Sequence, residues 1–243
     1  AFWMGDDAFY MYDGVVKKMP CSVQDYVYDD LSYTNKNDIA CGINPEFNEI
    51  MWYYPSGSAT QIDRVVVYNY LEGTWYTSTL GRTTYLGNYT FENPIATQYD
   101  AALVANATTS TGVTNTPYGV TAGASYVYNQ EIGNNQADGT ALSASLTTGS
   151  IEIADGDQFM SVSKFVPDFT SLTNNVAVTL TLEDYPQSAT SQTTSGNVTS
   201  TTTKINVRGR GRSVKLAFAS DTVGDTNWRL GSMKLQLRPD GRR

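Results

Sequence analysis

The feature that most constrains the fold of this 243-residue chain is a period-two alternation of apolar and polar residues. Side chains of an extended strand point alternately to opposite faces, so this period predicts half-buried strands. Strand-forming Thr, Val and Tyr are abundant, while apolar stripes of helical period are almost absent. The sequence therefore predicts an all-β fold. In one strand, threonines occupy one face and the other face carries Val176, Val178, Leu180 and Leu182.

The first hundred residues indicate consecutive antiparallel strands. Asp13-Gly14 between two apolar runs is a strong hairpin signal. The strands 50–54, 63–70 and 74–77 follow one another through short turns, which predicts a meander. Residues 23–33 could form a helix, although their apolar residues make no good stripe. We interpret residues 1–100 as the last meander blades of a β-propeller-like domain.

A loose internal repeat bears on the propeller interpretation. Tyr-Asx pairs end apolar runs at 12–13, 68–69 and 128–129, with spacings of 56 and 60 residues. Propeller blades usually span about 40–50 residues, so one extra loop would account for the excess. The alternative, that Tyr-Asx is simply a common strand end in a Tyr-rich chain, stays open.

From residue 141 onward, short strands follow at regular spacing, separated by polar turns. This pattern is typical of antiparallel sandwiches. We predict a β-sandwich-like or jelly-roll-like domain over 141–243 with a basic C-terminal end, preceded by a Thr/Gly-rich loop and a linking strand over 101–140. The polar tract 187–203 is expected to be an exposed loop or hairpin tip. The predicted strands are Leu142–Thr147, Phe159–Lys164, Val176–Leu182, Lys204–Val207, Ser213–Phe218 and Ser232–Leu237.

The chain contains no histidine, and this excludes much chemistry. Ser-His-Asp and Cys-His nucleophile pairs are ruled out, as is the commonest ligand of transition metals. The two cysteines make no disulfide framework, and the acidic pairs lack the spacing of a calcium loop. No run of about 18 apolar residues predicts a membrane-spanning helix. We predict no catalytic residue, no cofactor and no metal site, and therefore not an enzyme.

Charge is distributed unevenly along the chain. Residues 1–203 hold 6 basic and 21 acidic side chains, a net charge of −15. Residues 204–243 hold 10 basic and 3 acidic side chains, a net charge of +7. This division indicates that the two parts meet different partners, or meet each other across copies of the chain. A solvated mixture of charges that clusters by chance is the alternative.

The sequence Arg208-Gly209-Arg210-Gly211-Arg212 is the sharpest local feature. In an extended strand its guanidiniums share one face, and the glycines let another backbone approach the opposite face. Such a row suits carboxylates or phosphates, and our hypothesis is that it contacts an acidic neighbour rather than DNA. A hairpin bend with solvated arginines is the alternative. The candidate subunit-interface residues are Arg208, Arg210, Arg212, Arg229, Arg238, Arg242 and Arg243.

Aromatic residues offer a different kind of surface. Exposed rings on predicted strands could stack on sugars, and the candidates are Trp52, Tyr53, Tyr54, Tyr68, Tyr70, Trp75 and Tyr76. Residues that alternate along a strand place about half of their rings inward, so core packing is the favoured interpretation.

Three groups of residues carry a more specific signal. They are 41–44 with 47–55, then 63–70 with 75–76 and 82–83, and finally 208–210 with 227–231 and 238–243. Together they resemble tail nozzle or hub structural proteins of short-tailed bacteriophages, including those labelled packaged-DNA stabilisation proteins. The resemblance covers most of the chain apart from its Thr-rich loops, and its motifs are structural rather than catalytic.

That resemblance implies a homo-oligomeric ring, usually a hexamer, with portal-side adaptor and fibre proteins as neighbours and DNA passing through a central channel without sequence-specific binding. It implies a longer chain, and residue 1 lies inside a predicted strand. The Thr-rich insert at 105–125 departs from the expected pattern. The expected function is a structural part of the DNA-ejection conduit that retains packaged DNA, located in the virion after assembly in the host cytoplasm. The alternative is a carbohydrate-binding adhesin domain of a phage tail or cell surface.

Overall fold

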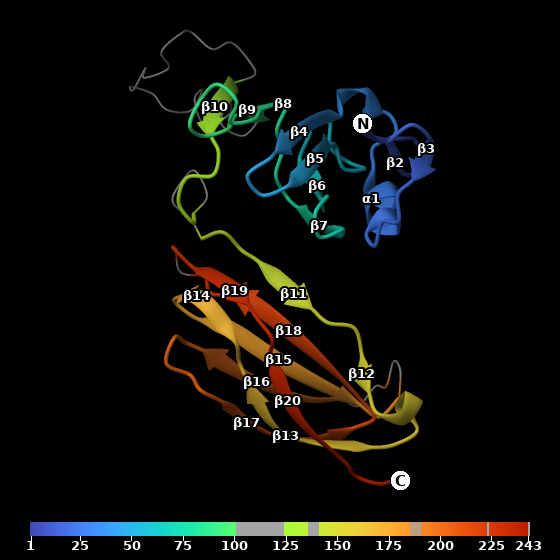
Figure 1. The fold of residues 1–243 in the computed structure, drawn as a ribbon, viewed down its shortest axis with the longest axis vertical. Coiled ribbons are helices and arrows are strands. Elements are labelled where there is room, and N and C mark those ends of the chain that lie inside the picture. The colour runs from blue at the N-terminus through green and yellow to red at the C-terminus, as the bar shows by residue number, and fades with distance from the viewer. Residues whose placement is uncertain (101–123, 136–140, 186–187, 189–190, 223, 243) are drawn as a thin grey trace. The chain divides into compact units, whose positions relative to one another are not determined.

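The computed structural model describes residues 1–100, 124–135, 141–185, 188, 191–222 and 224–242 (Figure 1). The chain divides into two compact units, residues 1–132 (unit 1) and 133–243 (unit 2). The described part of both units consists mainly of antiparallel strands, and none of its sheets closes into a barrel. The predicted all-β class is confirmed. Of the Thr-rich insert at 105–125, residues 105–123 lie outside the described part.

Unit 1 contains one short helix among its strands. The linking strand expected within 101–140 is β10, which pairs with β9 inside this unit. The elements are β1 (Phe2–Met4), β2 (Phe9–Tyr12), β3 (Val16–Lys18), α1 (Gln24–Asp30), the 3-10 turn η1 (Lys36–Asp38), β4 (Ala40–Asn44), β5 (Glu49–Tyr54), β6 (Arg64–Asn69), β7 (Thr74–Ser78), β8 (Thr84–Leu86), β9 (Ile95–Asp100) and β10 (Ala124–Asn129).

Four consecutive strands, β4 to β7, form the main antiparallel sheet of unit 1. The predicted meander of β5, β6 and β7 is therefore confirmed. β5 is buried on both faces of the sheet, which explains its continuous run of large apolar side chains. On one face, Trp52 and Tyr54 pack in a core with Val27 of α1. On the other face, Tyr53 packs in a second core that Tyr85 of β8 helps to close.

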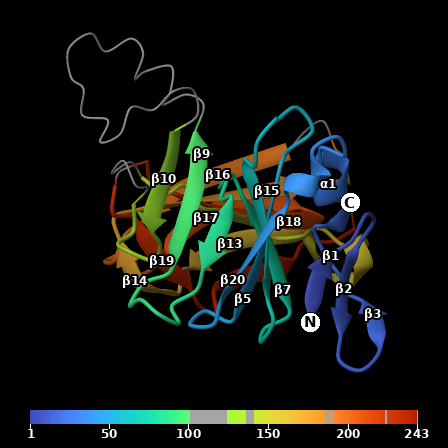
Figure 2. The same ribbon diagram turned by 90° about the horizontal axis from the view of Figure 1, so that it is seen from above.

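The N-terminal strands and the helix form a group beside that sheet. β2 and β3 make the predicted hairpin around Asp13-Gly14, where Gly14 has a φ of 114° that side chains with a Cβ rarely adopt. α1 lies within the segment 23–33 that could form a helix. Both views show α1 next to β1–β3 (Figure 1, Figure 2), and the Tyr28 hydroxyl donates a 3.0 Å hydrogen bond to the Gly5 carbonyl.

Unit 2 contains two antiparallel sheets and a separate strand pair. The larger sheet has the order β11-β18-β15-β16, with β12 also paired to β18; the smaller has the order β17-β13-β20, and β14 pairs with β19. The elements are β11 (Ser145–Thr147), β12 (Ile151–Glu152), the 3-10 turn η2 (Ala154–Gly156), β13 (Met160–Val166), β14 (Phe169–Thr173), β15 (Val176–Glu183), β16 (Ser191–Val198), β17 (Ile205–Gly211), β18 (Ser213–Ser220), β19 (Asn227–Leu230) and β20 (Lys234–Pro239).

One hydrophobic core joins the two sheets of unit 2. It contains Met160, Val162 and Phe165 from the smaller sheet together with alternate residues of β15 and β18 from the larger one. The alternation in 176–182 is confirmed, because its four apolar side chains are at most 1 % exposed and the threonines between them are more accessible. The sequence period therefore identified the core face of the central strand correctly.

The expectation of an exposed loop over 187–203 is wrong for residues 191–198. They form β16, which pairs with β15 along its whole length. Threonine favours extended backbone, and an edge strand with one largely solvent-facing side needs few apolar residues. The short strands β14 and β19 are not among the predicted strands either.

A basic face on the smaller sheet of unit 2

Residues 208–211 are extended, as one of the two interpretations predicts, whereas Arg212 lies in a bend. Arg208 and Arg210 face outward from β17, whereas Gly209 and Gly211 are buried. Arg212 is the single residue between β17 and β18, where the chain passes from the smaller sheet to the larger. The arginines thus share one side of the strand, with the glycines on the core side.

Both glycines face β15 of the same unit: Gly209 lies against a Leu182 side chain, and Gly211 lies against the backbone of Glu183. A Cβ at Gly209 would lie 2.8 Å from Leu182 Cδ1. A Cβ at Gly211 would lie 3.0 Å from Leu182 Cβ and 3.1 Å from the Glu183 backbone nitrogen, which has no freedom to move aside. The close approach predicted from the glycines is therefore an internal sheet-to-sheet contact.

Arg210 is engaged within unit 2. Its Nε donates a 2.7 Å hydrogen bond to Asp240 Oδ2, and its Nη2 donates a 3.3 Å bond to the Asp240 carbonyl. Its guanidinium carbon lies 3.8 Å from the centroid of the Phe159 ring. These contacts fix the segment that follows β20 against the end of β17.

Arg212 is also engaged, and it uses three backbone carbonyls. Its guanidinium donates to the carbonyls of Gly156, Asp157 and Arg242 at 3.0, 3.1 and 3.2 Å. Residues 154–157 form the tight turn expected from Ala-Asp-Gly-Asp, with positive φ at 154, 155 and 156. The Arg212 guanidinium also lies over the Phe159 ring, 4.6 Å from its centroid. We call Arg210, Arg212 and Phe159 the arginine clamp.

The outer face of the smaller sheet carries a second, different set of cations. Lys164, Arg208, Lys234 and Arg238 project from its three strands, and we call these four residues the basic face. None of the four side chains makes an ion pair or hydrogen bond to another residue in the described part of the chain. The basic face therefore has no partner within that part.

Strand register shows how the basic face is arranged. Ser161 of β13 lies between Arg210 and Arg238, and Lys164 lies between Asn206 and Gln236. Neighbouring strands are about 4.8 Å apart, so the outer strands β17 and β20 are about 10 Å apart across β13. The outward strand positions carry no carboxylate, and the nearby Asp240 is held by Arg210. The result is a flat array of cations spaced by small polar side chains.

The remaining predicted interface arginines lie elsewhere. Arg229 is opposite Thr170 in the β14–β19 pair, outside the smaller sheet. Arg242 is exposed beyond β20, and its carbonyl accepts from Arg212. Arg243 lies outside the described residues. The structure thus brings only Arg208, Arg210 and Arg238 of the predicted set together on one sheet face.

Sequence reasoning missed Lys164 and Lys234. The alternation Lys-Leu-Gln-Leu-Arg over 234–238 already places Lys234 on the same side as Arg238. Lys164 is harder to find because a bulge between Val162 and Lys164 shifts the phase of β13. The strand order β17-β13-β20 places these segments side by side, and no local sequence pattern predicts that order.

The difference in net charge between the two units is smaller than the difference between residues 1–203 and 204–243. Unit 1 has 5 Lys and Arg against 14 Asp and Glu, a net charge of −9; unit 2 has 11 against 10, a net charge of +1. Residues 204–242 are not a separate tail, because β17 and β20 belong to the smaller sheet of unit 2, β18 to the larger sheet, and β19 to the pair with β14. Cations gather on one face rather than over the whole unit.

Most of the candidate sugar-stacking aromatics serve the core of unit 1. Trp52 and Tyr54 are buried. The Trp75 ring contacts the rings of Tyr68, Phe9 and Trp52, with centroids 4.5, 4.7 and 5.9 Å apart. The Trp75 indole nitrogen donates to the Pro20 carbonyl at 3.0 Å. Core packing, the favoured interpretation, is confirmed for these rings.

Unit 1 holds two carboxyl groups that accept hydrogen bonds, of which Glu49 is half-buried and Glu131 is more exposed but partly desolvated. Asn44 donates to Glu131 Oε1 at 3.2 Å, and the Tyr76 hydroxyl donates to Glu49 Oε1 at 3.0 Å. Burial raises the pKa of both Glu49 and Glu131. Across the described residues, no group of three or more Cys, Asp or Glu side chains could hold a metal ion.

Comparisons with protein-family models and with curated proteins found no match. No helix in the described part is both long and apolar enough to cross a membrane.

Proposed function

We propose that this chain is a structural component of the tail of a short-tailed bacteriophage. It forms one subunit of a homo-oligomeric nozzle or hub ring, with six copies as the expected number, around the conduit for DNA ejection. It contributes to retaining packaged DNA in the virion and performs no catalysis. Unit 1 corresponds to propeller-like blades, and unit 2 to a sandwich-like domain.

The residues that carry the resemblance lie mainly in paired strands of the two units, which supports this proposal. The stretches 41–44 and 47–55 form β4, β5 and the turn between them, and 63–70 with 75–76 form most of β6 and β7. One meander sheet therefore contains two of the three sequence groups. The third group supplies parts of β17, β19 and β20 in unit 2.

The basic face is the observation that carries the proposal. A soluble monomer has no need of a flat, carboxylate-free array of Lys and Arg on a sheet, whereas a subunit that docks against an acidic neighbour does. Charge pairs across such a contact fix the register of neighbouring subunits and exclude wrong ones. The chain's net charge of −8 also disfavours tight binding of DNA that must slide past.

Electron microscopy and native mass spectrometry of the purified chain test the proposal. We expect rings with six-fold symmetry, and only weak, salt-sensitive binding of a fluorescent duplex oligonucleotide. A particle that stays monomeric at all concentrations and binds sugars on a glycan array would contradict the proposal and favour the adhesin alternative. Tight duplex binding at physiological salt would contradict the role as a conduit.

A further inference from the structure

We infer that the basic face of unit 2 docks head-to-tail on the α1 surface of unit 1 in a second copy of this chain. This inference rests on the proposed function, because it names the surfaces that join neighbouring subunits. It differs from the hypothesis based on Arg208, Arg210 and Arg212 alone, since the arginine clamp occupies two of those three residues.

Unit 1 presents the complementary charge, because most of its few cations already have partners. Lys17 pairs with Asp13 at 2.8 Å, and Lys36 pairs with Asp6 at 2.9 Å. Arg82 is buried and donates to neutral oxygens, including the Gly81 carbonyl at 2.8 Å. Apart from Lys18 and Arg64, the cations of unit 1 therefore already have partners within the unit. The excess of carboxylates over cations in unit 1 stays uncompensated.

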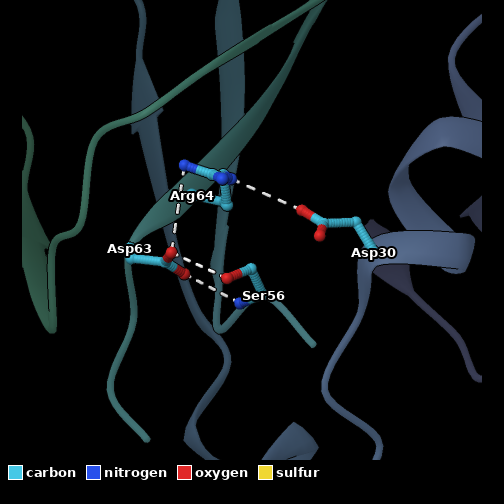
Figure 3. Close-up of polar contacts among 4 residues, drawn as sticks. All are labelled: Asp30, Ser56, Asp63 and Arg64. Carbon is cyan, nitrogen blue, oxygen red and sulfur yellow. Dashed lines mark hydrogen bonds and ion pairs between the residues drawn. The ribbon is translucent and has the colours of Figure 1, made fainter. Parts of the chain in front are cut away.

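Arg64 is the remaining engaged cation, and it ties α1 to the main sheet. Its guanidinium lies 3.4 Å from Asp30 of α1 and 3.9 Å from Asp63 (Figure 3). Asp63 in turn accepts hydrogen bonds of 2.7 and 2.8 Å from the Ser56 backbone nitrogen and hydroxyl. With Val27 buried on the sheet side, these contacts hold the outer side of α1 toward solvent.

That outer side carries two exposed carboxylates without a cationic partner in the described residues. Asp25 and Asp29 are four residues apart, so they lie next to each other on one side of the helix. Like charges at this spacing repel each other in isolated helices, and a cationic partner would relieve that repulsion. Asp7 lies near α1, because it interacts electrostatically with Tyr28, whose hydroxyl donates to the Gly5 carbonyl two residues before Asp7.

The two surfaces are different patches of the same molecule, which determines the kind of assembly. A contact between unlike patches is heterologous, and it closes into a ring or extends as a filament depending on the rotation between copies. Charge complementarity favours a second copy over a nucleic acid, because a chain of net charge −8 repels a polyanion at low ionic strength.

A charge-swap experiment on the full chain tests this inference. The first variant combines Arg208→Glu with Arg238→Glu, and the second combines Asp25→Lys with Asp29→Lys. Sedimentation velocity at low ionic strength should show self-association of the natural chain that either variant weakens about tenfold or more. An equimolar mixture of the two variants should restore association, because each then offers the charge that the other lacks.

The matched control combines Arg229→Glu with Arg242→Glu, which makes the same charge change outside the basic face. It should associate like the natural chain. If both reversal variants still assemble, or if their mixture fails to recover, the inference is wrong, whereas ring formation by the natural chain would leave the proposed function standing. Open filaments that show the charge-swap rescue would support the inference and contradict the ring.

Two further outcomes identify other partners and overturn the inference. A natural chain that stays monomeric while the first variant loses tight duplex-DNA binding would assign the basic face to a phosphate backbone. A monomer whose sedimentation coefficient falls equally in both variants, independent of concentration, would place the contact inside one chain. Circular dichroism of each variant confirms that the strands are retained in every comparison.

Discussion

At the residue scale, neighbouring carbonyls decide which arginines hold the fold and which stay available. Arg212 faces three carbonyl oxygens, and its planar guanidinium can donate to all of them at once. Arg208 is only four residues away on the same side of the strand, yet its surroundings on the sheet are small polar side chains. Identical residue types in one short motif therefore serve different purposes.

Replacing Arg212 by Lys should separate charge from geometry. An ammonium keeps the charge but lacks the planar fork, so we expect a loss of about 1–2 kcal/mol in the stability of unit 2. Hydrogen exchange should rise in segments 154–157 and 238–242. Arg208→Lys is the control and should change stability by less than about 0.5 kcal/mol. Equal effects of the two substitutions would contradict the distinction.

The Glu49–Glu131 pair predicts a pH dependence of unit 1. Because burial raises the pKa of these carboxyls in the fold, the folded state binds protons more tightly than the unfolded state. Stability should therefore increase as pH falls from neutral through the folded pKa values, and level off below about 4.3, the ordinary value for Glu.

Glu131→Gln tests that dependence directly. It should raise the melting temperature at pH 7 by about 1–3 °C and flatten the rise on acidification, because the charge that burial opposes is gone. Glu72→Gln, in the exposed turn between β6 and β7, is the matched control and should change the melting temperature at pH 7 less than Glu131→Gln does. A profile that is identical in all three proteins would disprove the assignment to this pair.

At the element scale, the two glycines of β17 let the sheets of unit 2 approach each other. The strand gives up side chains on its inner face, so Leu182 packs against Gly209 and Gly211, and the Glu183 backbone approaches Gly211. In return, the outer face of the same strand is free to carry arginines. Packing on one side and charge on the other are thus set by a single alternating sequence.

Gly211→Ala should be among the most damaging small substitutions in unit 2. The added methyl group meets backbone atoms of Glu183, so relief requires the sheets to separate, at a cost of about 1–3 kcal/mol. Gly149→Ala is the control, because nothing lies within 4 Å of its Cβ position. Urea unfolding monitored by circular dichroism measures the difference. A neutral Gly211→Ala variant would show that this contact is not tight.

The sequence predicts strands well where one face is apolar and poorly where both are polar. Val176 to Leu182 revealed β15 because burial imposes the period, whereas the Thr-rich β16 was expected as a loop. The basic face was only partly predictable, because Arg208 and Arg238 are visible locally but their neighbour Lys164 depends on strand order and a bulge. Long-range pairing, rather than propensity, determines that arrangement.

At the scale of the whole molecule, the two units have separate hydrophobic cores. Unit 1 surrounds its main sheet with two clusters, and unit 2 has a core shared by its two sheets. The units also differ in net charge, −9 against +1. Each unit therefore has its own source of stability, while complementary charge is available for contacts between copies.

Leu180→Ala tests whether the cores are energetically separate. Removing this fully buried side chain should destabilise unit 2 by about 2–5 kcal/mol. Hydrogen exchange should then accelerate in β15 and β18 and stay unchanged in β5 and β6. Val66→Ala provides the reciprocal control in unit 1, where Val66 is fully buried. Simultaneous loss of protection in both units would show that they unfold as one.

The order of the strands in the smaller sheet has a consequence for timing. Its three strands come from residues 160–166, 205–211 and 234–239, so the sheet is complete only when β20 has been added to β13 and β17. A chain still emerging from the ribosome without β20 lacks Lys234 and Arg238, and its β13 has only one of its two partners. The basic face therefore forms only after β20 has been synthesised, which delays association between copies that still lack this strand.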